Sequence, residues 1–301
     1  MRCAIAQNWP AAAPDGLVVP TGEVHVWRAW LTSSAGQLEC LARVLSTDEI
    51  ARARHYAFAR DREHFIVRRA VLRQLLGSYL AVKPQELVFC YGPHGKPALP
   101  PSRYGQPLEF NLSHSHGLAL FALCANSPVG IDVEWRRPVL DMEAIAKHYF
   151  SKREYTRMAA AAPKLRQTVF FNAWARTEAY LKATGEGLAG LEGVEASCLR
   201  GEAARLFKTG TDPSTHSPWV LRQIRPAAGF TAALVYRGAL TKIQRWTWSD
   251  AYRASGPRAT QATNPTAIKP KYSSMGPSPY AGSVPLLGQD LQNVAKDTSS
   301  C

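Results

Sequence analysis

Residues 108–134, LEFNLSHSHGLALFALCANSPVGIDVE, decide the fold. Apolar runs alternate here with turns rich in Ser, His, Asn, Gly and Pro, which is typical of short buried strands. The pattern predicts three strands, over residues 108–112, 118–124 and 129–134, with turns at 113–117 and 126–128. We expect a small buried sheet in the middle of the chain, with any chemistry at the ends of its strands.

Helix and strand patterns flank this central sheet on both sides. Upstream, apolar spacing predicts a strand over 22–31 and a long amphipathic helix within 61–80. Downstream, Ser-Lys-Arg-Glu at 151–154 is a capping-box signature for a helix start, and helical spacing over 165–183 stops at Gly185. Two late strands are expected as a hairpin, over residues 220–224 and 231–236.

The order of these elements predicts an α/β (α+β) protein of two similar halves followed by a tail. We expect an N-terminal half over 1–128, a C-terminal half over 129–248 and a low-complexity tail over 249–301. The last 51 residues hold 6 Pro, 4 Gly and 7 Ser with hardly any periodic apolar pattern, so we expect disorder there. An extension packed over the core stays open as the alternative, since Leu286 and Leu287 form an apolar pair.

The composition is that of a folded protein. With 301 residues, of which 46% are hydrophobic and 20% charged, collagen-like and wholly disordered chains are excluded. No apolar run reaches the ~20 clean residues of a membrane span, and the N-terminus lacks the apolar core of a secretory signal. We therefore expect a cytoplasmic protein that does not enter a membrane. Its six cysteines form no CxxC pair, which excludes the common zinc motifs.

The chain is strongly basic, with a formal net charge of +13 at pH 7. This charge attracts anionic partners, whether nucleic acid, an acidic protein or a phosphorylated small molecule. We do not expect nucleic acid, because the basic residues are spread along the chain and no zinc-finger or RNP-type signature accompanies them.

Asp132 and Glu134 flank Val133 in a predicted strand, and a period of two puts both carboxylates on one face. Two adjacent carboxylates repel each other unless a cation lies between them. Oxygen ligands of this kind suit Mg²⁺ or Mn²⁺. The alternative is a strand end whose carboxylates are only solvated.

Glu178 and Lys182 are four residues apart on a predicted helix, so they share a face. An ordinary helical salt bridge is the alternative for this pair. The setting favours a site, because Trp174 lies one turn before Glu178 and a Gly-rich exit over 185–187 follows.

Ser113 and His114 offer a hydroxyl and an imidazole to which a phosphate could hydrogen-bond. An ordinary polar turn is the alternative, and Lys96 and Arg52 are cations of the first half that could equally be solvated. No GxSxG elbow supports a Ser-His hydrolase. The loops GxxxxGK followed by Ser or Thr, and GxGxxG, are also absent, so a phosphate site would be built from dispersed side chains.

Three motifs in order resemble those of the Sfp-type 4′-phosphopantetheinyl transferases. They are FNLSHS at 110–115, VGIDVE at 129–134 and WARTEAYLK at 174–182. The resemblance implies a chain of two similar α/β halves related by pseudo-twofold symmetry, with a site between them. It also implies transfer of the phosphopantetheine arm of coenzyme A to a serine of an acyl or peptidyl carrier protein, with release of 3′,5′-ADP.

By motif position the resemblance also assigns roles to residues. A Mg²⁺ cofactor, or Mn²⁺ in its place, would be held by Asp132, Glu134 and Glu178. The catalytic residues would be Glu178, Lys182 and Asp132. Glu178, or a metal-bound water that it orients, would deprotonate the carrier serine, and Lys182 would neutralise developing charge. Coenzyme A, the substrate, would contact Arg52, Lys96, Ser113, His114, Arg136 and Lys182.

An acidic carrier protein would suit this basic chain. We expect a carrier helix to dock on the apolar stretch over 142–149, with ordinary core packing as the alternative, and we expect the chain to act as a monomer. Thr177 stands where the family commonly has lysine, and His64 where an arginine is often found. A catalytically weak module that binds coenzyme A or a carrier is therefore the alternative function, and a basic nucleic-acid binder is a third.

Overall fold

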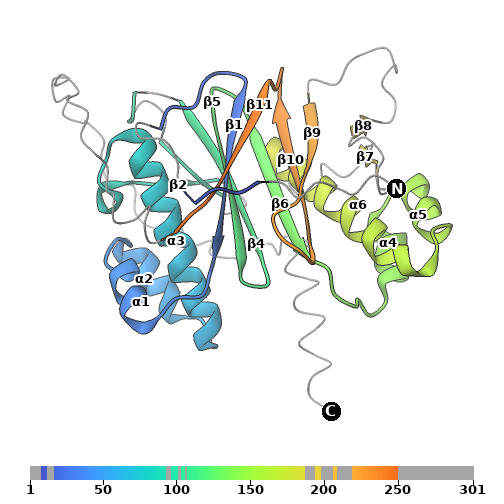
Figure 1. The fold of residues 1–301 in the computed structure, drawn as a ribbon, viewed down its shortest axis with the longest axis horizontal. Helices are drawn as coiled ribbons and strands as arrows, with labels where there is room; N and C mark the ends of the chain where they lie inside the picture. The colour runs from blue at the N-terminus through green and yellow to red at the C-terminus, as the bar shows by residue number, and fades with distance from the viewer. Residues whose placement is uncertain are drawn as a thin grey trace.

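The computed structural model describes residues 8–11, 17–92, 96–100, 103–105, 107–186, 194–197, 206–208 and 219–249. Figure 1 shows two sheets in the middle of the molecule with helices on either side. Apart from Ser249, the expected tail over 249–301 lies outside the described residues.

The first half contains a strand, a group of helices and a hairpin-rich segment. Its elements are β1 (Glu23–Trp30), α1 (Ala35–Ala42), α2 (Thr47–Arg54), α3 (Ala59–Leu80), a 3-10 helix (Pro84–Glu86), β2 (Cys90–Tyr91), β3 (Pro97–Ala98), β4 (Leu108–Ser115) and β5 (Leu118–Ala125).

The second half begins at the strand that carries the acidic motif. Its elements are β6 (Val129–Trp135), α4 (Met142–Tyr149), α5 (Lys152–Ala159), α6 (Pro163–Thr184), β7 (Val194–Ala196), β8 (Leu206–Lys208), β9 (Trp219–Ile224), β10 (Phe230–Arg237) and β11 (Lys242–Thr247). The capping box at Ser151 and Glu154 is formed as predicted, and α6 ends at Gly185, whose φ of 77° is left-handed.

Two sheets form the framework, with strand orders β11-β1-β5-β4 and β6-β10-β9. All neighbours in them are antiparallel except β11, which runs parallel to β1 and places Ile243 opposite Val24. The last strand thus returns to the first sheet, more than a hundred residues after the other strands of that sheet.

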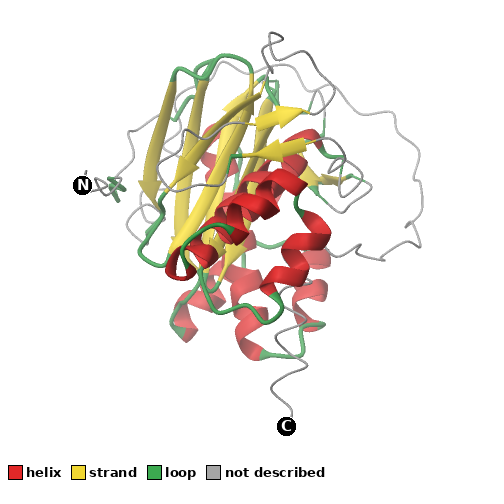
Figure 2. Cartoon of the chain, turned by 90° about the vertical axis from the view of Figure 1, so that its right-hand side faces the viewer, coloured by secondary structure: helices red, strands yellow, loops and turns green. Residues whose placement is uncertain are grey.

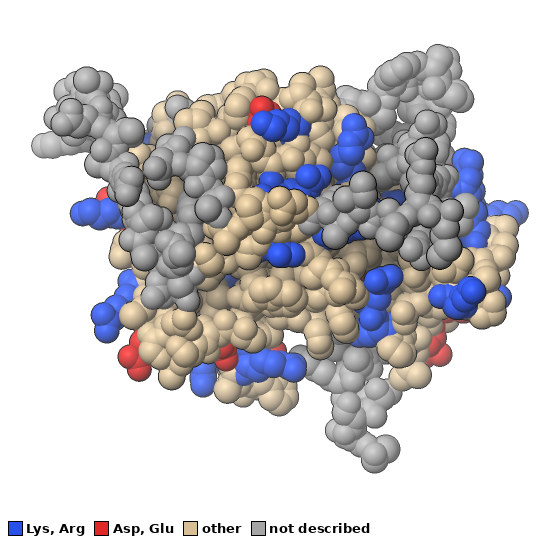
Figure 3. All heavy atoms as spheres, in the orientation of Figure 1, with Lys and Arg blue, Asp and Glu red and all other residues tan. Residues whose placement is uncertain are grey.

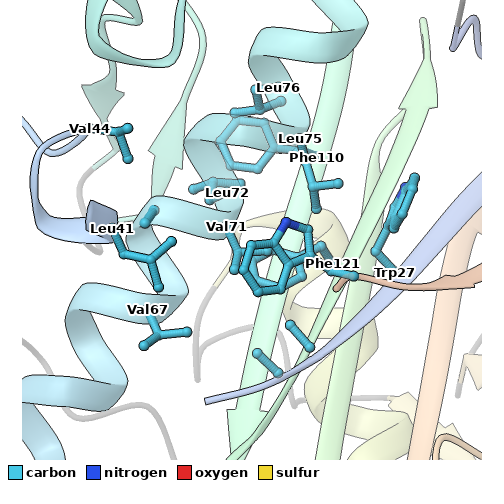
Figure 4. Packing of buried hydrophobic residues seen from close by; sticks show 14 of the residues in the cluster. Trp27, Leu41, Val44, Val67, Val71, Leu72, Leu75, Leu76, Phe110 and Phe121 are labelled. Carbon is cyan, nitrogen blue, oxygen red and sulfur yellow. The ribbon is translucent and has the colours of Figure 1, made fainter. Parts of the chain in front are cut away.

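The layers are helices, sheet, sheet and helix (Figures 1 and 2). Alternate residues of β5 show this, because Leu118 and Leu120 pack between the two sheets while Phe121 and Leu123 pack toward α3. Figure 4 shows Phe121 beside the α3 side chains that cover the first sheet. On the far side, α6 covers the outer face of β10, so β5 and β10 are buried on both faces.

The structure is α+β with two α/β halves in sequence, as expected. One boundary differs by more than two residues, because β4 continues through Ser115 and only His116 and Gly117 form the turn, with φ of 46° and 79°. The expected turn over 113–117 is therefore wrong in its first three residues. Ser113 and Ser115 stay in the strand because their backbones pair with β5.

The apolar side of α4 packs inward. Met142, Ile145 and Tyr149 are partly buried against a cluster that contains Trp174 and Phe170. Ordinary core packing thus accounts for much of the apolar stretch over 142–149. None of the helices in the described part of the chain is long and apolar enough to cross a membrane.

Candidate functional site

Asp132 and Glu134 lie on the face of β6 that is turned toward α6. Ile131 and Val133 pack into the apolar core between the sheets, so the alternation of the strand directs the two carboxylates to the opposite face. Both side chains are buried, with 3% and 6% of their surface exposed. A period of two along the strand predicts this shared face.

Helix α6 reaches these carboxylates because it crosses β6 at Gly130. A Cβ atom at Gly130 would lie 2.0 Å from the carbonyl oxygen of Ala179 and 2.5 Å from the amide nitrogen of Ala183. Only a residue without a side chain allows so close an approach. The contact places Glu178 and Lys182 of α6 beside the β6 carboxylates.

Lys182, Asp132 and Ser113 form a compact hydrogen-bonded group. Lys182 Nζ donates to Asp132 Oδ1 at 2.6 Å and lies 3.2 Å from Ser113 Oγ, which itself donates to the same Asp132 oxygen at 2.8 Å. The other carboxylate oxygen, Asp132 Oδ2, is buried and has no hydrogen-bond partner. This oxygen is therefore available to a ligand at the site.

The site holds more negative than positive charge. Burial, and then the charge of Asp132, raise the pKa of Glu134 to about 8. Burial raises the pKa of Glu178 to about 7, against the lowering effect of Lys182. Burial disfavours the charge of the Lys182 ammonium, but Asp132 and Glu178 outweigh it and raise the pKa of Lys182. Further positive charge would therefore stabilise the carboxylates.

The donor set fits a hard divalent cation. All candidate ligands are carboxylate oxygens, which Mg²⁺ prefers, and Mg²⁺ usually takes only one or two of them together with substrate phosphate oxygens. Within the described residues, no three His, Cys, Asp or Glu side chains are gathered as a ready-made metal site, and the Lys182 ammonium contacts Asp132 instead. The unpartnered Asp132 Oδ2 is an oxygen that could bind such a cation.

Two of the other predicted contacts, Lys96 and His114, lie close to Lys182. Lys96 Nζ donates to the main-chain oxygen of Lys182 at 2.7 Å, which ties the β2–β3 hairpin to the last turn of α6. Burial, and then the positive charges of Arg68 and Lys182, hold the pKa of His114 well below its usual value. His114 is thus a neutral imidazole among cationic neighbours, a setting suited to an anion.

The contacts of Arg52 and Arg136 lie outside the group around Lys182. The exposed Arg52 lies with its guanidinium carbon 5.7 Å from the centre of the Phe65 ring. Arg136 Nε lies 3.3 Å from the carbonyl oxygen of Gly229. Roles for Arg52 and Arg136 in binding coenzyme A stay predictions.

Sequence reasoning missed Arg137, an arginine that faces one of the β6 carboxylates. Arg137 Nη1 lies 3.8 Å from Glu134 Oε2, three residues along the chain. It also missed Asn111 and Ser115, although Asn111, Ser113 and Ser115 repeat with the period of two that puts strand side chains on one face. Their hydrogen bonds to β6 follow from that repeat.

The motif residue Thr177 is buried, and its neighbour Arg176 does not replace a lysine there. Arg176 Nη1 donates to the carbonyl oxygen of Ser197 and Arg176 Nη2 donates to Gln223 Oε1 at 3.0 Å. Both contacts are made away from the β6 carboxylates, on the side of β9. These contacts hold the Arg176 guanidinium toward Ser197 and Gln223.

Figure 3 shows Lys and Arg side chains spread over both halves of one face, with Asp and Glu in few places. This distribution agrees with the net charge of +13. The surface view therefore shows a broad cationic character and no single basic stripe.

Comparisons with known proteins find two family models and several proteins that are similar to this chain. A family model described as the 4′-phosphopantetheinyl transferase superfamily matches residues 128–235, and a model described as 4′-phosphopantetheinyl transferase, N-terminal, matches residues 28–126. The chain is 40% identical to the 4′-phosphopantetheinyl transferase HetI of Nostoc sp. over 225 residues. These residues cover 75% of this chain and 92% of that protein. It is 25% identical over 196 residues to the 4′-phosphopantetheinyl transferase Sfp of Bacillus subtilis, covering 63% of this chain and 81% of that protein.

Proposed function

The chain belongs to the 4′-phosphopantetheinyl transferase superfamily and is of Sfp type, and from this premise we propose a Mg²⁺-dependent reaction at the carboxylates of β6 and α6. As an enzyme of this family it transfers phosphopantetheine from coenzyme A to carrier proteins. The proposal adds the residues that act and the release of 3′,5′-ADP. The observation that carries it is the buried Asp132 carboxylate where β6 meets α6, with one oxygen hydrogen-bonded to Lys182 and the other without a hydrogen-bond partner.

Asp132, Glu134 and Glu178 would hold the metal ion. When bound, Mg²⁺ would act as a Lewis acid that neutralises the pyrophosphate oxygens of coenzyme A. The buried Asp132 Oδ2, which has no hydrogen-bond partner, supports this assignment because it offers a free lone pair to a cation.

Glu178 is the group we assign to proton removal. It is buried on α6 beside Asp132, and a positioned glutamate is a residue type that serves as a general base. As the serine oxygen of the carrier bonds to the β-phosphorus of coenzyme A, Glu178 takes the serine proton, and the bond from that phosphorus to the oxygen bridging to 3′,5′-ADP breaks.

Lys182 supplies the fixed positive charge for the leaving group. Its ammonium is held by Asp132 and Ser113, and its raised pKa keeps it protonated. Lys96 and His114 would bind further phosphate oxygens, and the +13 charge would favour an acidic carrier protein. Because β6 and α6 belong to one chain, a monomer would suffice.

The proposal is tested by intact-mass measurement of an apo carrier protein after incubation with the chain and coenzyme A. The carrier should gain ~340 Da, one phosphopantetheine arm, when Mg²⁺ is present and not when it is chelated. Equal gain under chelation would refute the metal dependence. No gain with several acidic carriers would refute the activity.

A catalytically weak module that binds coenzyme A is the second candidate. The observation in its favour is that Thr177 stands where the family commonly has lysine, while the neighbouring Arg176 contacts Ser197 and Gln223. Coenzyme A binding without any mass gain would favour this candidate.

A further inference from the structure

The edges of the two sheets meet along β4 and β6, and side chains of β4 hydrogen-bond to the backbone of β6 there. Asn111 Oδ1 accepts from the Ile131 amide at 2.8 Å, Ser113 Oγ from the Val133 amide at 3.4 Å, and Ser115 Oγ from the Trp135 amide at 3.1 Å. In every one of these bonds the two partners are 20 residues apart in the sequence. We call these three bonds the β4–β6 ladder.

The ladder occupies backbone groups that β10 leaves free. β6 pairs with β10 on one side, and successive residues of a strand direct their amides to alternate sides. The amides at Ile131, Val133 and Trp135 therefore point toward β4. Side-chain oxygens of β4 accept from them, where a paired strand would offer backbone carbonyls.

The two serines also contact the carboxylates. Ser113 Oγ donates to Asp132 Oδ1 at 2.8 Å, and Ser115 Oγ donates to Glu134 Oε2 at 3.3 Å. A hydroxyl can do both because it has one hydrogen to donate and lone pairs to accept. Asn111 accepts from the amide of Ile131, and the residue before Ile131 is Gly130, which has no carboxylate.

We propose that Ser115 is a positioning residue for Glu134, fixing its carboxylate through the β4–β6 ladder. This inference rests on the proposed function, in which Glu134 helps to hold the metal ion. Ser115 is 3% exposed, so water cannot easily take over its hydroxyl. Its acceptor bond locks it to β6 while its donor bond sets the side-chain direction of Glu134, whose other near partner is Arg137 at 3.8 Å.

Groups that orient the ligands of a metal change metal affinity or activity by ~10–100-fold when they are removed. Ser115→Ala should therefore raise the Mn²⁺ concentration for half-saturation by about tenfold. It should also lower kcat with little change in KM for the carrier. Ser115→Thr keeps the hydroxyl and should restore both values.

Asn111→Ala provides the matched control, because it removes a bond of the same ladder without touching a carboxylate. It should lower the melting temperature and leave the Mn²⁺ half-saturation unchanged. Ser78→Ala, which removes only a bond from Ser78 Oγ to the Gln74 carbonyl in α3, controls for the loss of a serine elsewhere.

The experiment is a Mn²⁺ titration of the full chain with coenzyme A present, followed by electron paramagnetic resonance, together with steady-state transfer rates. Weaker Mn²⁺ binding in Ser115→Ala, rescued by threonine and absent in Asn111→Ala, supports the proposal. Wild-type Mn²⁺ binding in Ser115→Ala overturns it, and so does an equal loss in Asn111→Ala. A wild-type chain that transfers normally but binds no Mn²⁺ overturns the metal assignment and this inference with it, while the transferase activity stands.

Discussion

Gly130→Ala should push α6 away from β6. The new Cβ would lie 2.0 Å from the Ala179 carbonyl oxygen and 2.5 Å from the Ala183 amide nitrogen, while ordinary contacts begin at 3.4 Å. Both obstacles are helix backbone, which cannot rotate aside as a side chain can. The helix must therefore move by about 1 Å or more at this crossing.

Two consequences follow for Gly130→Ala, and they are measured separately. Overpacking of this kind costs about 1–3 kcal/mol of unfolding free energy, which denaturant unfolding will show. Misplacing a reacting group by ~1 Å can cost about 10²-fold in rate, and the displaced helix carries both Glu178 and Lys182. The transfer rate to a carrier protein should fall by that order in protein that is still folded.

Gly36→Ala is the matched control. Nothing lies within 4 Å of a Cβ at Gly36, which is exposed in α1. That variant should keep full activity and gain up to ~1 kcal/mol in stability from its better helix propensity. Wild-type rate and stability in Gly130→Ala would show that α6 does not approach β6 as closely as described.

Three further predictions concern stability and the contacts between the halves. Burial lowers the pKa of His25 from 6.5 to about 4, so the unfolded chain takes up a proton at higher pH than the folded chain does. The free energy of unfolding should therefore fall by up to ~2 kcal/mol between pH 7 and pH 5. His25→Phe should flatten this dependence on pH, as measured by denaturant unfolding. Glu49→Ala should cost ~3–5 kcal/mol in the same assay, because Glu49 is the buried partner of both Arg69 and Arg73. Lys96→Met keeps the apolar stem but loses the hydrogen bond to the last turn of α6, and its kcat/KM should fall by about tenfold, the equivalent of one charged hydrogen bond.

Each of these three predictions has a result that would contradict it. An unchanged slope between pH 7 and pH 5 in His25→Phe would mean that His25 is not the titrating group. A loss below ~1 kcal/mol in Glu49→Ala would place its ion pairs in the range of exposed ones. Full activity in Lys96→Met would make that contact dispensable for transfer.

Short-range patterns in the sequence predict much of the site. The period of two in β6 predicts the shared face of Asp132 and Glu134, and the spacing of four in α6 predicts that of Glu178 and Lys182. The capping box at 151–154 predicts the start of α5. These patterns succeed because each depends on neighbouring residues of one element.

Features that depend on residues far apart in the sequence cannot be predicted from these short-range patterns. The return of β11 to pair with β1 joins residues more than 200 positions apart. Ser113 and Ser115 resemble turn residues, and only their pairing with β5 and their bonds to β6 keep them in a strand. In the same way, Arg137 faces Glu134, while Arg136 lies beside the Gly229 carbonyl oxygen, nearly a hundred residues away in the sequence.

The most direct test of the site is the single-turnover rate of Glu178→Gln on an apo carrier protein, with coenzyme A and Mg²⁺ present. Removal of a general base should lower this rate by ~10²–10⁴-fold, while Glu186→Gln, an exposed glutamate just beyond α6, should leave it unchanged. A loss of only about threefold in Glu178→Gln, far smaller than the loss expected for a general base, would contradict the assignment of proton removal to Glu178.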